Sequence, residues 1–412
     1  MEVLTLNCWG LKYLSKAREQ RLRAIADRIA DTHHDIVTLQ EIWVESQDWQ
    51  YMRAVCADRY PHGRFFLTGA FGSGLAVLSR HPIVSMDTHM FRLTGTPVFV
   101  HQGDWIAGKG CGRVTIAHPA LGLVDVHTAH FTALGSQMGP EIQRAFRTTE
   151  AYELAQRCAA SAHAGRHVLC TGDFNSLPTS LCMSLLYSVG GMHDALTHLR
   201  SGDGQADITC DSPRNTWTHG KKLEPWAVQQ GGKRLDYILY RGPSSLPNRL
   251  TCTSHKVTFT ELMPDLHVSY SDHFGIVATF DIQAEGSAPR GAKCESRIDV
   301  LQRALLPLRE ALRGAVTMQK RHLAVFLTLL GLDAILVAAL ACVDARHRST
   351  ASTVFVSLLM VAATWAGTTA LYSGVVWGEW HKRALRAFID EIETEAGIDK
   401  WLSLIHISEP TR

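Results

Sequence analysis

Two polar side chains directly follow an apolar run in the stretch HVLCTGDFNS, residues 167–176. The run predicts a buried strand, which a Thr-Gly pair ends. Asp173 and Asn175 are two residues apart, so a carboxylate and an amide can both leave the sheet edge while Phe174 points into the core. The pair suits chemistry, although an Asx turn that merely ends a strand would give the same pattern.

A second carboxylate and a second amide stand at strand ends nearer the N-terminus. Residues 3–8 alternate apolar and polar side chains as a sheet strand does, and they include Asn7. Residues 35–43 form a buried strand that runs into Glu41. Because burying a lone carboxylate is costly, Glu41 must reach solvent, pair with a base or hold a cation. Asn7 either satisfies backbone groups or takes part in a site.

An acid and a histidine stand together before the last predicted strand, 276–282. Asp272 and His273 directly precede this strand, and Asp236 lies at the head of the strand predicted at 234–240. A lone histidine is more often structural. A histidine that is flanked by one acid and accompanied by acids at other strand ends is typical of a catalytic pair.

Two further histidines share one strand of a hairpin predicted at 114–117 and 123–131. His127 and His130 are three residues apart, so a regular strand turns them to opposite faces. Only one of them can therefore serve the site.

Helices must cover the sheets that these strands form. Residues 15–32 place apolar side chains at helical spacing with arginines opposite, which predicts an amphipathic helix, and residues 141–162 predict a long helix. Residues 215–218 predict a further short strand. Helices and strands alternate irregularly, with strand pairs between them, which predicts a two-sheet α/β sandwich rather than a doubly wound parallel sheet.

The composition shows no strong electrostatic bias. The 412 residues are 46% hydrophobic and 19% charged with a formal net charge of +2, so the basic surplus typical of a nucleic-acid binder is missing. The length suits one large domain plus an appendage. The ten cysteines are scattered without zinc spacing, which predicts buried free thiols in a reducing compartment. The first residues lack the pattern of a signal peptide.

Two long apolar runs near the C-terminus predict a transmembrane hairpin. Residues 323–343 and 354–377 are each long enough to cross a bilayer. Asp333 interrupts the first run, and a carboxylate at this depth must face a partner helix or a polar cavity. Thr364 and Trp365 are its candidate neighbours.

Positive charge predicts the orientation of this hairpin. The outer ends of the two runs carry Lys320, Arg321, Lys382, Arg383 and Arg386, against Arg346 and Arg348 in the loop between them. Both termini are therefore expected on the cytoplasmic side.

The domain boundaries follow from these patterns. We expect one domain over residues 1–284, a linker with an amphipathic juxtamembrane helix over 285–322, a short loop over 344–353 and a C-terminal cytoplasmic helix over 378–401. Residues 402–412 differ in character from this helix and are interpreted as a translated adapter sequence with no functional role.

Five motifs together resemble a known superfamily. LNCWG, LQEIW, TGDFN, RLDYI and SDHFG, in this order, are similar to the endonuclease/exonuclease/phosphatase superfamily over residues 3–282. The resemblance implies a four-layer α/β/β/α sandwich that hydrolyses phosphate esters with Mg²⁺, for which Mn²⁺ can substitute. Glu41 would be the principal metal ligand, Asn7 would lie beside the metal and the phosphate, and Asp272 would be a further carboxylate on the metal side.

The same resemblance assigns catalytic roles. His273 would be the general base and Asp236 would orient it, while Asp173 and Asn175 would position the attacking water and the phosphate. His130, in TAHFTA, would contact the phosphate oxygens. Ala129 and Thr132 depart from the pattern around this histidine, which leaves His127 as the alternative.

Elementary chemistry accounts for these residue types. A phosphodiester is anionic, so a divalent cation on oxygen ligands must offset the charge that grows on the phosphoryl oxygens. A histidine, whose ordinary pKa is about 6.5, can take a proton from water near neutral pH.

The C-terminal hairpin narrows the resemblance to one branch, the neutral Mg²⁺-dependent sphingomyelinases of the short two-span type. The motif HQGDWIAGKG resembles an insertion of that branch, in which Asp104 and Lys109 would switch the site between resting and active states; an ordinary surface loop is the alternative. The branch cleaves sphingomyelin to ceramide and phosphocholine. The implied partners are a membrane phospholipid, the bilayer and an activating anionic lipid, with no nucleic acid.

Other functions remain open from the sequence. The same chemistry could act on lyso-platelet-activating factor or ceramide phosphoethanolamine. The chain could instead be a nuclease of the superfamily or a membrane-anchored interaction protein with an inactive fold. The membrane could be that of the endoplasmic reticulum, the Golgi, the nucleus or the cell surface.

Overall fold

The computed structural model describes residues 1–98, 103–133, 141–197, 199, 207–283, 295–344 and 349–408. The chain divides into two compact units. One comprises Met1–Gly95 and Gln102–Arg303, and the other comprises Thr96–His101 and Ala304–Arg412. Part of the predicted linker (285–294), Arg346 and Arg348 of the predicted loop and the last four residues of the tail lie outside the described residues.

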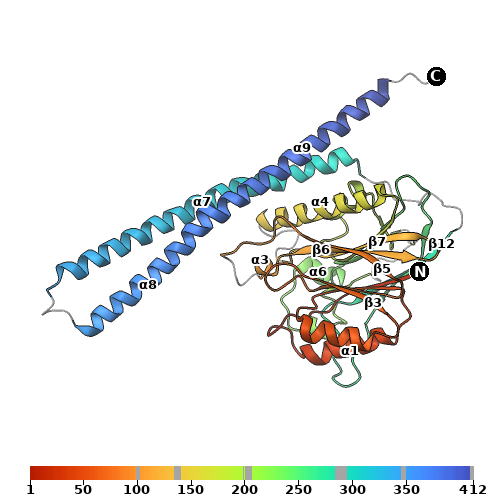
Figure 1. The fold of residues 1–412 in the computed structure, drawn as a ribbon, viewed down its shortest axis with the longest axis horizontal. Coiled ribbons are helices and arrows are strands. Elements are labelled where there is room, and N and C mark those ends of the chain that lie inside the picture. Colours follow the sequence, from red (N-terminus) through yellow and green to blue (C-terminus); the bar gives the residue numbers. More distant parts are fainter. Residues whose placement is uncertain are drawn as a thin grey trace. The chain divides into compact units, whose positions relative to one another are not determined.

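Two six-stranded sheets form the centre of the first unit (Figure 1). The strands of the first sheet are β1 Glu2–Asn7, β2 Ile36–Gln40, β3 His62–Phe66, β4 Leu75–Ser79, β11 Leu250–Thr258 and β12 Gly275–Ile282. They lie in the order β11-β12-β1-β2-β4-β3. Strands β1 and β2 are parallel, and the other neighbours in this sheet are antiparallel.

The second sheet repeats this plan. Its strands are β5 Ile83–Met90, β6 Gly110–His118, β7 Gly122–His130, β8 His167–Asp173, β9 His193–Asp194 and β10 Asp236–Arg241. They lie in the order β5-β6-β7-β8-β10-β9, and only the β7–β8 pair is parallel. Each sheet therefore contains one parallel pair whose carboxyl ends share an edge.

Helices cover the outer face of each sheet. The helical segments of the first unit are α1 Arg18–Ala30, η1 Glu45–Trp49, α2 Gln50–Val55, α3 Asp104–Ala107, α4 Glu141–His163, α5 Leu181–Ser188, η3 Thr216–Thr218 and α6 Pro225–Gln230. Helices α1 and α4 lie on opposite sides of the two sheets (Figure 1). Helix α4 contacts β8, and α5 packs on α4. The predicted four-layer α/β/β/α sandwich is confirmed.

Two apolar layers hold the sandwich together. Between the sheets, Val77 of the first sheet is buried in one cluster with Val126 and Leu169 of the second. On the outer face of the first sheet, the apolar side chains of α1, among them Ile25, pack against β1 and β2. Burial of such side chains contributes about 1.5–3 kcal/mol each, so both layers are needed to hold the strand ends in place.

Two sequence expectations for this unit are wrong. Residues 215–218 were expected as a strand but form the 3-10 turn η3, because the side chain of Asn215 caps Trp217 N. Arginines were expected opposite the apolar face of α1, but Arg21 is fully buried. Its guanidinium reaches backbone carbonyl groups that an apolar side chain could not satisfy.

The second unit contains long apolar helices. Its helical segments are α7 Arg297–Cys342, which begins in the first unit, α8 Thr350–Tyr372, η5 Ser373–Trp377 and α9 Gly378–Ser408. The predicted juxtamembrane helix and first span are thus one continuous helix. Within the described residues, α7 and the α8–α9 segment each contain a stretch long and apolar enough to cross a membrane. Apolar side chains on them, such as Ile335 and Val361, are exposed.

Asp333 of α7 has the partner that the sequence predicted. Thr364 Oγ1 of α8 donates a hydrogen bond to Asp333 Oδ2 at 2.7 Å. Beside this contact, Gly367 of α8 lies against Leu329 of α7, where a Cβ atom would lie 3.5 Å from Leu329 Cβ. Helices α7 and α8 therefore meet through both a polar contact and apolar packing.

The cysteines in the described part of the chain are free thiols, as predicted. Eight of the described cysteines are buried, and Cys342 is exposed.

Candidate active site

The strand-end residues of the first sheet meet at one edge. Strands β1 and β2 run parallel with Asn7 paired to Gln40, so Glu41 follows directly beside Asn7. Asn7 Nδ2 donates a hydrogen bond to Glu41 Oε1 at 3.0 Å. Trp43 Nε1 lies 3.4 Å from Glu41 Oε2. The carboxylate of Glu41 is thus held between two donors.

Three strands of the second sheet present polar residues side by side. In the register of the sheet, Asp173 at the end of β8 is paired with His130 at the end of β7 and with Asp236 at the start of β10. Because β7 and β8 are parallel and β10 is antiparallel to them, all three side chains lie at the same edge. The sequence predicted these strand ends, and the pairing brings them together.

Unusual backbone angles occur where the strands end. Trp9, Glu41 and Asn175 adopt positive φ angles of 47°, 60° and 45°, respectively. Non-glycine residues pay for this conformation, and they retain it where the surrounding structure or a function requires it. Gly172 has φ 136°, and a Cβ atom there would lie 2.0 Å from the carbonyl oxygen of Ala129. Glycine is therefore required just before Asp173.

A hydrogen bond joins the two sheets at this edge. Asn7 Nδ2 donates to Asp173 Oδ2 at 3.0 Å as well as to Glu41. Burial raises the pKa of Glu41 above its ordinary value, and the charge of Asp272 adds to this effect. Burial likewise raises the pKa of Asp173 to about 7, and the charge of Asp236 adds to it, although His273 opposes the shift. Burial and neighbouring acids therefore disfavour the charged forms of Glu41 and Asp173.

His273 lies between two acids. Its Nδ1 is 2.9 Å from Asp236 Oδ2, and its Nε2 is 3.7 Å from Asp173 Oδ2. Burial disfavours the charged imidazole, but the neighbouring groups, Cys210, Asp236 and Asp173, raise the pKa of His273 well above its ordinary value. Because Asp236 is an acceptor, the Nδ1 atom carries a proton, and Nε2 faces the cluster.

His130 joins the cluster, and His127 does not. His130 Nε2 lies 3.8 Å from Glu41 Oε1 and 3.6 Å from Asp173 Oδ2. His127 Nε2 lies 3.0 Å from the Ser161 hydroxyl of α4, on the other face of the strand. The odd spacing of the two histidines predicted opposite faces, and the structure selects His130 as the one at the site.

Asp104 and Lys109 are buried next to His130 rather than exposed on a surface loop. Lys109 Nζ lies 3.0 Å from His130 Nδ1 and 3.7 Å from Asp104 Oδ1, and both side chains are almost fully buried. Burial raises the pKa of Asp104 above its ordinary value, while Lys109 opposes that shift. The polar, glycine-rich sequence around them concealed this burial.

Asn175 and Asp272 take peripheral positions. The side-chain amide of Asn175 donates to the Phe131 carbonyl at 3.0 Å, and its backbone N–H donates to Asp173 Oδ1 at 2.9 Å. Asp272 Oδ2 lies 3.4 Å from Lys221 Nζ. Lys221 had not been identified from the sequence.

Other hydrogen bonds that the sequence did not reveal fix the segment before β12. Ser271 Oγ donates to the Asn7 carbonyl at 2.6 Å and accepts from His273 N at 3.2 Å. Asn215 Nδ2 donates to the Ser271 carbonyl at 2.9 Å. The sequence signal for this support is an asparagine that can cap the backbone two residues on, at Trp217.

Helix α4 supports the end of β7 in a similar way. The carboxylate of Glu150 accepts from Thr132 Oγ1 at 2.6 Å and from Thr132 N at 2.9 Å. Burial raises the pKa of Glu150 to about 7. Thr132, which departs from the family pattern, therefore has a structural partner.

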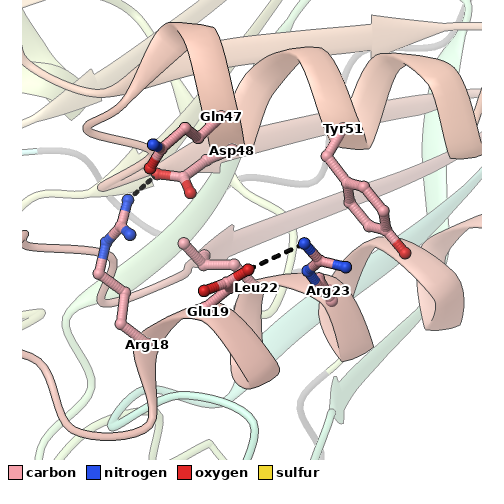
Figure 2. A pocket seen from close by; sticks show the side chains of 7 residues that line it. All are labelled: Arg18, Glu19, Leu22, Arg23, Gln47, Asp48 and Tyr51. Atoms are coloured by element: carbon pink, nitrogen blue, oxygen red, sulfur yellow. Dashed lines mark hydrogen bonds and ion pairs between the residues drawn. The ribbon is translucent and has the colours of Figure 1, made fainter.

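A separate cavity of about 290 Å³ lies by α1, η1 and α2 (Figure 2). It is lined by Arg18, Glu19, Leu22, Arg23, Gln47, Asp48 and Tyr51. Its arginines are paired with acids, Arg18 with Asp48 and Arg23 with Glu19 (Figure 2). None of the strand-end residues lines it, so we do not regard it as the active site.

The strand-end cluster fits a divalent cation. We define this cluster as Asn7, Glu41, His130, Asp173, Asp236 and His273. Ligand atoms of Asp173, Asp236 and His273 all lie within 4.8 Å of one another. The Oδ1 atom of Asp236 is buried without a hydrogen-bond partner, and the pKa of Glu41 and of Asp173 is raised by burial. A cation beside Glu41 and Asp173 would relieve the repulsion among the acids. Carboxylate oxygens with an amide suit hard cations.

The profile of the Endonuclease/Exonuclease/phosphatase family matches residues 4–273, which contain every residue of this cluster. The chain belongs to the endonuclease/exonuclease/phosphatase family. A human relative named sphingomyelin phosphodiesterase 2 is 33% identical over 283 residues, which cover 69% of this chain and 65% of the human protein. A Schizosaccharomyces pombe relative named inositol phosphosphingolipids phospholipase C is 31% identical, and the match covers 69% of each chain.

A solved structure shares the fold. The crystal structure of SmcL superposes with a TM-score of 0.52 at 20% identity, covering 68% of this chain and 98% of SmcL. The match to the human relative spans just under two thirds of that protein's length. The resemblance to the neutral sphingomyelinases of the endonuclease/exonuclease/phosphatase family is confirmed by these relatives.

Proposed function

We propose that this chain is a metal-dependent phosphodiesterase that hydrolyses a phosphosphingolipid at a membrane surface. The observation that carries the proposal is the imidazole of His273, held by Asp236 and facing Asp173 within a cluster of buried acids. The names of the relatives, sphingomyelin phosphodiesterase 2 and inositol phosphosphingolipids phospholipase C, support a sphingolipid substrate. The specific reaction we favour is cleavage of sphingomyelin to ceramide and phosphocholine with Mg²⁺.

In this proposal His273 is the general base. Asp236 fixes the proton on Nδ1, which leaves Nε2 free to take a proton from the attacking water. The water oxygen bonds to phosphorus while the bond from phosphorus to the ceramide oxygen breaks. The ceramide oxygen takes its proton from solvent water, and His273 returns the proton that it accepted to solvent, so the step balances.

Neighbouring side chains would position the substrate. Asp173 and Asn175 would orient the water and the phosphate. His130, backed by Lys109 at 3.0 Å, would donate to a phosphate oxygen. Asp104 would adjust this arrangement through its contact with Lys109, as the switch that the family resemblance implies.

Glu41, Asn7 and Asp272 would hold the cation. When bound, the cation would offset the negative charge that grows on the phosphoryl oxygens. It would also lower the pKa of His273 to a value nearer neutral pH. Asp173 also lies within reach of this position, because Asn7 Nδ2 bridges it to Glu41.

The apolar helices would keep the enzyme at its substrate. We propose that residues 323–343 and 354–377 span a membrane, with both termini cytoplasmic. The length and apolarity of the two helical stretches support this. The Asp333–Thr364 hydrogen bond would satisfy the carboxylate within the hairpin.

A second candidate substrate has specific support. The Schizosaccharomyces pombe and Saccharomyces cerevisiae relatives, both 31% identical, are named inositol phosphosphingolipids phospholipase C. The same chemistry would then release phosphoinositol instead of phosphocholine. The two substrates differ only in the headgroup, so a headgroup-release assay distinguishes them.

The decisive experiment uses the purified full chain in mixed micelles. Labelled sphingomyelin, labelled inositol phosphoceramide and a DNA duplex are offered with Mg²⁺ or with a chelator. We expect Mg²⁺-dependent release of one lipid headgroup and no cleavage of DNA. His273→Ala should reduce the rate by about 10²- to 10⁴-fold. His127→Gln, which changes a buried histidine outside the cluster, should retain the activity. Cleavage of DNA but not lipid, or no metal-dependent hydrolysis at all, would overturn the proposal.

A further inference from the structure

Large apolar side chains are exposed in segments that adjoin the active site. We define the apolar rim as Tyr13, Leu14, Leu67, Phe71 and Trp105, whose exposed fractions are 90%, 74%, 68%, 71% and 40%. Tyr13 and Leu14 follow β1, Leu67 and Phe71 lie between β3 and β4, and Trp105 belongs to α3. Single exposed apolar residues are ordinary, but several around one site indicate an interaction surface.

The sheet topology puts these segments at the edge that carries the candidate site. Strand β1 ends at Asn7, beside Glu41. Strand β4 is antiparallel to β2 and to β3, so the segment from β3 to β4 also leaves the sheet at this edge. The loop between β10 and β11, which contains Leu246, leaves its sheet at the opposite edge, because β10 begins at the site with Asp236.

Backbone hydrogen bonds attach the rim segments to the site. Gly10 N donates to the Glu41 carbonyl at 3.0 Å, and Ile42 N donates to the Gly74 carbonyl at 2.9 Å. Ala70 N donates to the Ile106 carbonyl at 3.0 Å, which holds the Phe71 segment against α3. The rim segments are therefore anchored on both sides of Glu41 and on the helix that carries Asp104.

The chemistry of the rim suits a bilayer surface. Tyrosine and tryptophan prefer the interface between water and lipid, where their rings are buried and their polar atoms stay wet. Lys12 Nζ lies 5.2 Å from the centre of the Tyr13 ring, so a cation accompanies the aromatic group. The same chain carries two apolar helical stretches long enough to cross a membrane. A bilayer is thus the apolar surface that this chain would always have beside it.

We propose that the apolar rim docks on the lipid bilayer and delivers the scissile phosphodiester to the strand-end cluster. Its aromatic and leucine side chains enter the headgroup region, and the phosphate of a lipid then lies level with Glu41 and His130. The proposal rests on the proposed function in that the substrate is a membrane lipid. It assigns a role to residues outside the catalytic cluster.

The test measures docking separately from hydrolysis. The full chain, with Cys294 and Cys342 replaced by serine, is reconstituted into vesicles of phosphatidylcholine and sphingomyelin. An environment-sensitive fluorophore is attached at Phe71→Cys, and the matched control carries it at Leu246→Cys, which is 59% exposed at the opposite edge. Nitroxide groups on lipid headgroups should quench the fluorophore at position 71 and not at position 246.

A second measurement compares two substrates. The double variant Tyr13→Ser, Phe71→Ser should hydrolyse bilayer sphingomyelin about tenfold or more slowly, because two large apolar groups no longer enter the interface. Its hydrolysis of the water-soluble bis-p-nitrophenyl phosphate should match that of the wild type. Leu246→Ser should change neither rate.

The outcomes distinguish this proposal from the proposed function. Equal quenching at both positions, or equal loss on both substrates, overturns the docking surface. Concentration-dependent protection of position 71 in detergent without lipid assigns the rim to a second copy of the chain and also overturns it. Selective quenching in a wild-type chain that hydrolyses no phosphosphingolipid supports the docking surface and refutes the proposed function.

Discussion

The buried guanidinium of Arg21 should be among the most important stabilising groups of the first unit. Arg21 is fully buried on α1. It donates four hydrogen bonds to backbone carbonyls, those of Lys16 at 2.8 Å, Cys8 at 3.0 Å, Tyr270 at 2.9 Å and Trp9 at 2.6 Å. The segment after β1 and the segment before β12 are thereby tied to one side chain. Replacing Arg21 with methionine keeps the apolar stem and removes every donor.

The magnitude follows from these contacts. A buried polar group left without a partner costs about 1–3 kcal/mol. Trp9 is only half-buried, so water can replace part of the lost bonding. The stacking of the guanidinium 4.5 Å from the Trp9 ring is lost as well. Removal of the buried charge itself gives some free energy back, since burial lowers the pKa of Arg21 to about 10. We expect Arg21→Met to reduce the free energy of unfolding by about 3–6 kcal/mol.

The assay is urea unfolding of the first unit in the detergent-solubilised full chain, monitored by tryptophan fluorescence. Arg23→Met is the matched control, because Arg23 lies on the same helix but is exposed, where it pairs with Glu19 and lies 5.0 Å from the centre of the Tyr51 ring (Figure 2). An exposed pair contributes about 0–1 kcal/mol. If Arg21→Met destabilised the unit by no more than Arg23→Met does, the view that its hydrogen bonds hold the two segments would be refuted.

Three further predictions concern pH, Lys109 beside His130 and the turn before Asp173. Burial lowers the pKa of His127 to about 4, so below the ordinary pKa of 6.5 the unfolded chain binds a proton that the folded chain does not. The contribution of His127 to the free energy of unfolding is complete above pH 6.5, so this free energy should fall by about 2 kcal/mol at pH 5. Urea titrations of His127→Gln should lack this part of the loss. Lys109→Met should lower headgroup release by about 10²-fold, because it removes the ammonium group 3.0 Å from His130. Lys222→Met, at an exposed lysine, should not lower it. Wild-type activity in Lys109→Met would contradict this role. Gly172→Ala should destabilise the unit by about 3 kcal/mol or more in the same urea assay, because its Cβ would collide with the Ala129 carbonyl, and a wild-type midpoint would show that the turn can adapt.

Much of the fold could be predicted because local patterns determine it. The apolar run before Asp173 and the alternation before Asn7 correspond to β8 and β1, with the polar residues at the strand ends. The two apolar runs near the C-terminus correspond to exposed apolar helices. In each case the spacing of side chains along the chain, which the sequence contains directly, decides the outcome.

The environment of individual side chains could not be predicted in the same way. The sequence predicts that Lys109 is a surface residue, because lysine and its glycine neighbours are usually exposed. The structure buries it beside His130. The sequence predicts that Arg21 belongs to a polar helix face. In the structure it donates hydrogen bonds to backbone carbonyls up to 249 positions away in the chain. Such partners exist only after distant segments have come together, and no spacing rule encodes them.

The relative placement of the two sheets depends on hydrogen bonds just beneath the site. Thr171 Oγ1 of the second sheet donates to Thr38 Oγ1 of the first at 2.8 Å, and Gln40 Nε2 lies 3.2 Å from Thr128 Oγ1. All four side chains are fully buried, where apolar residues would be the default. Apolar contacts tolerate small shifts between packed sheets, whereas buried hydrogen bonds require a defined geometry. These polar contacts therefore fix the register between the sheets where the cluster needs it, since the cluster draws side chains from both.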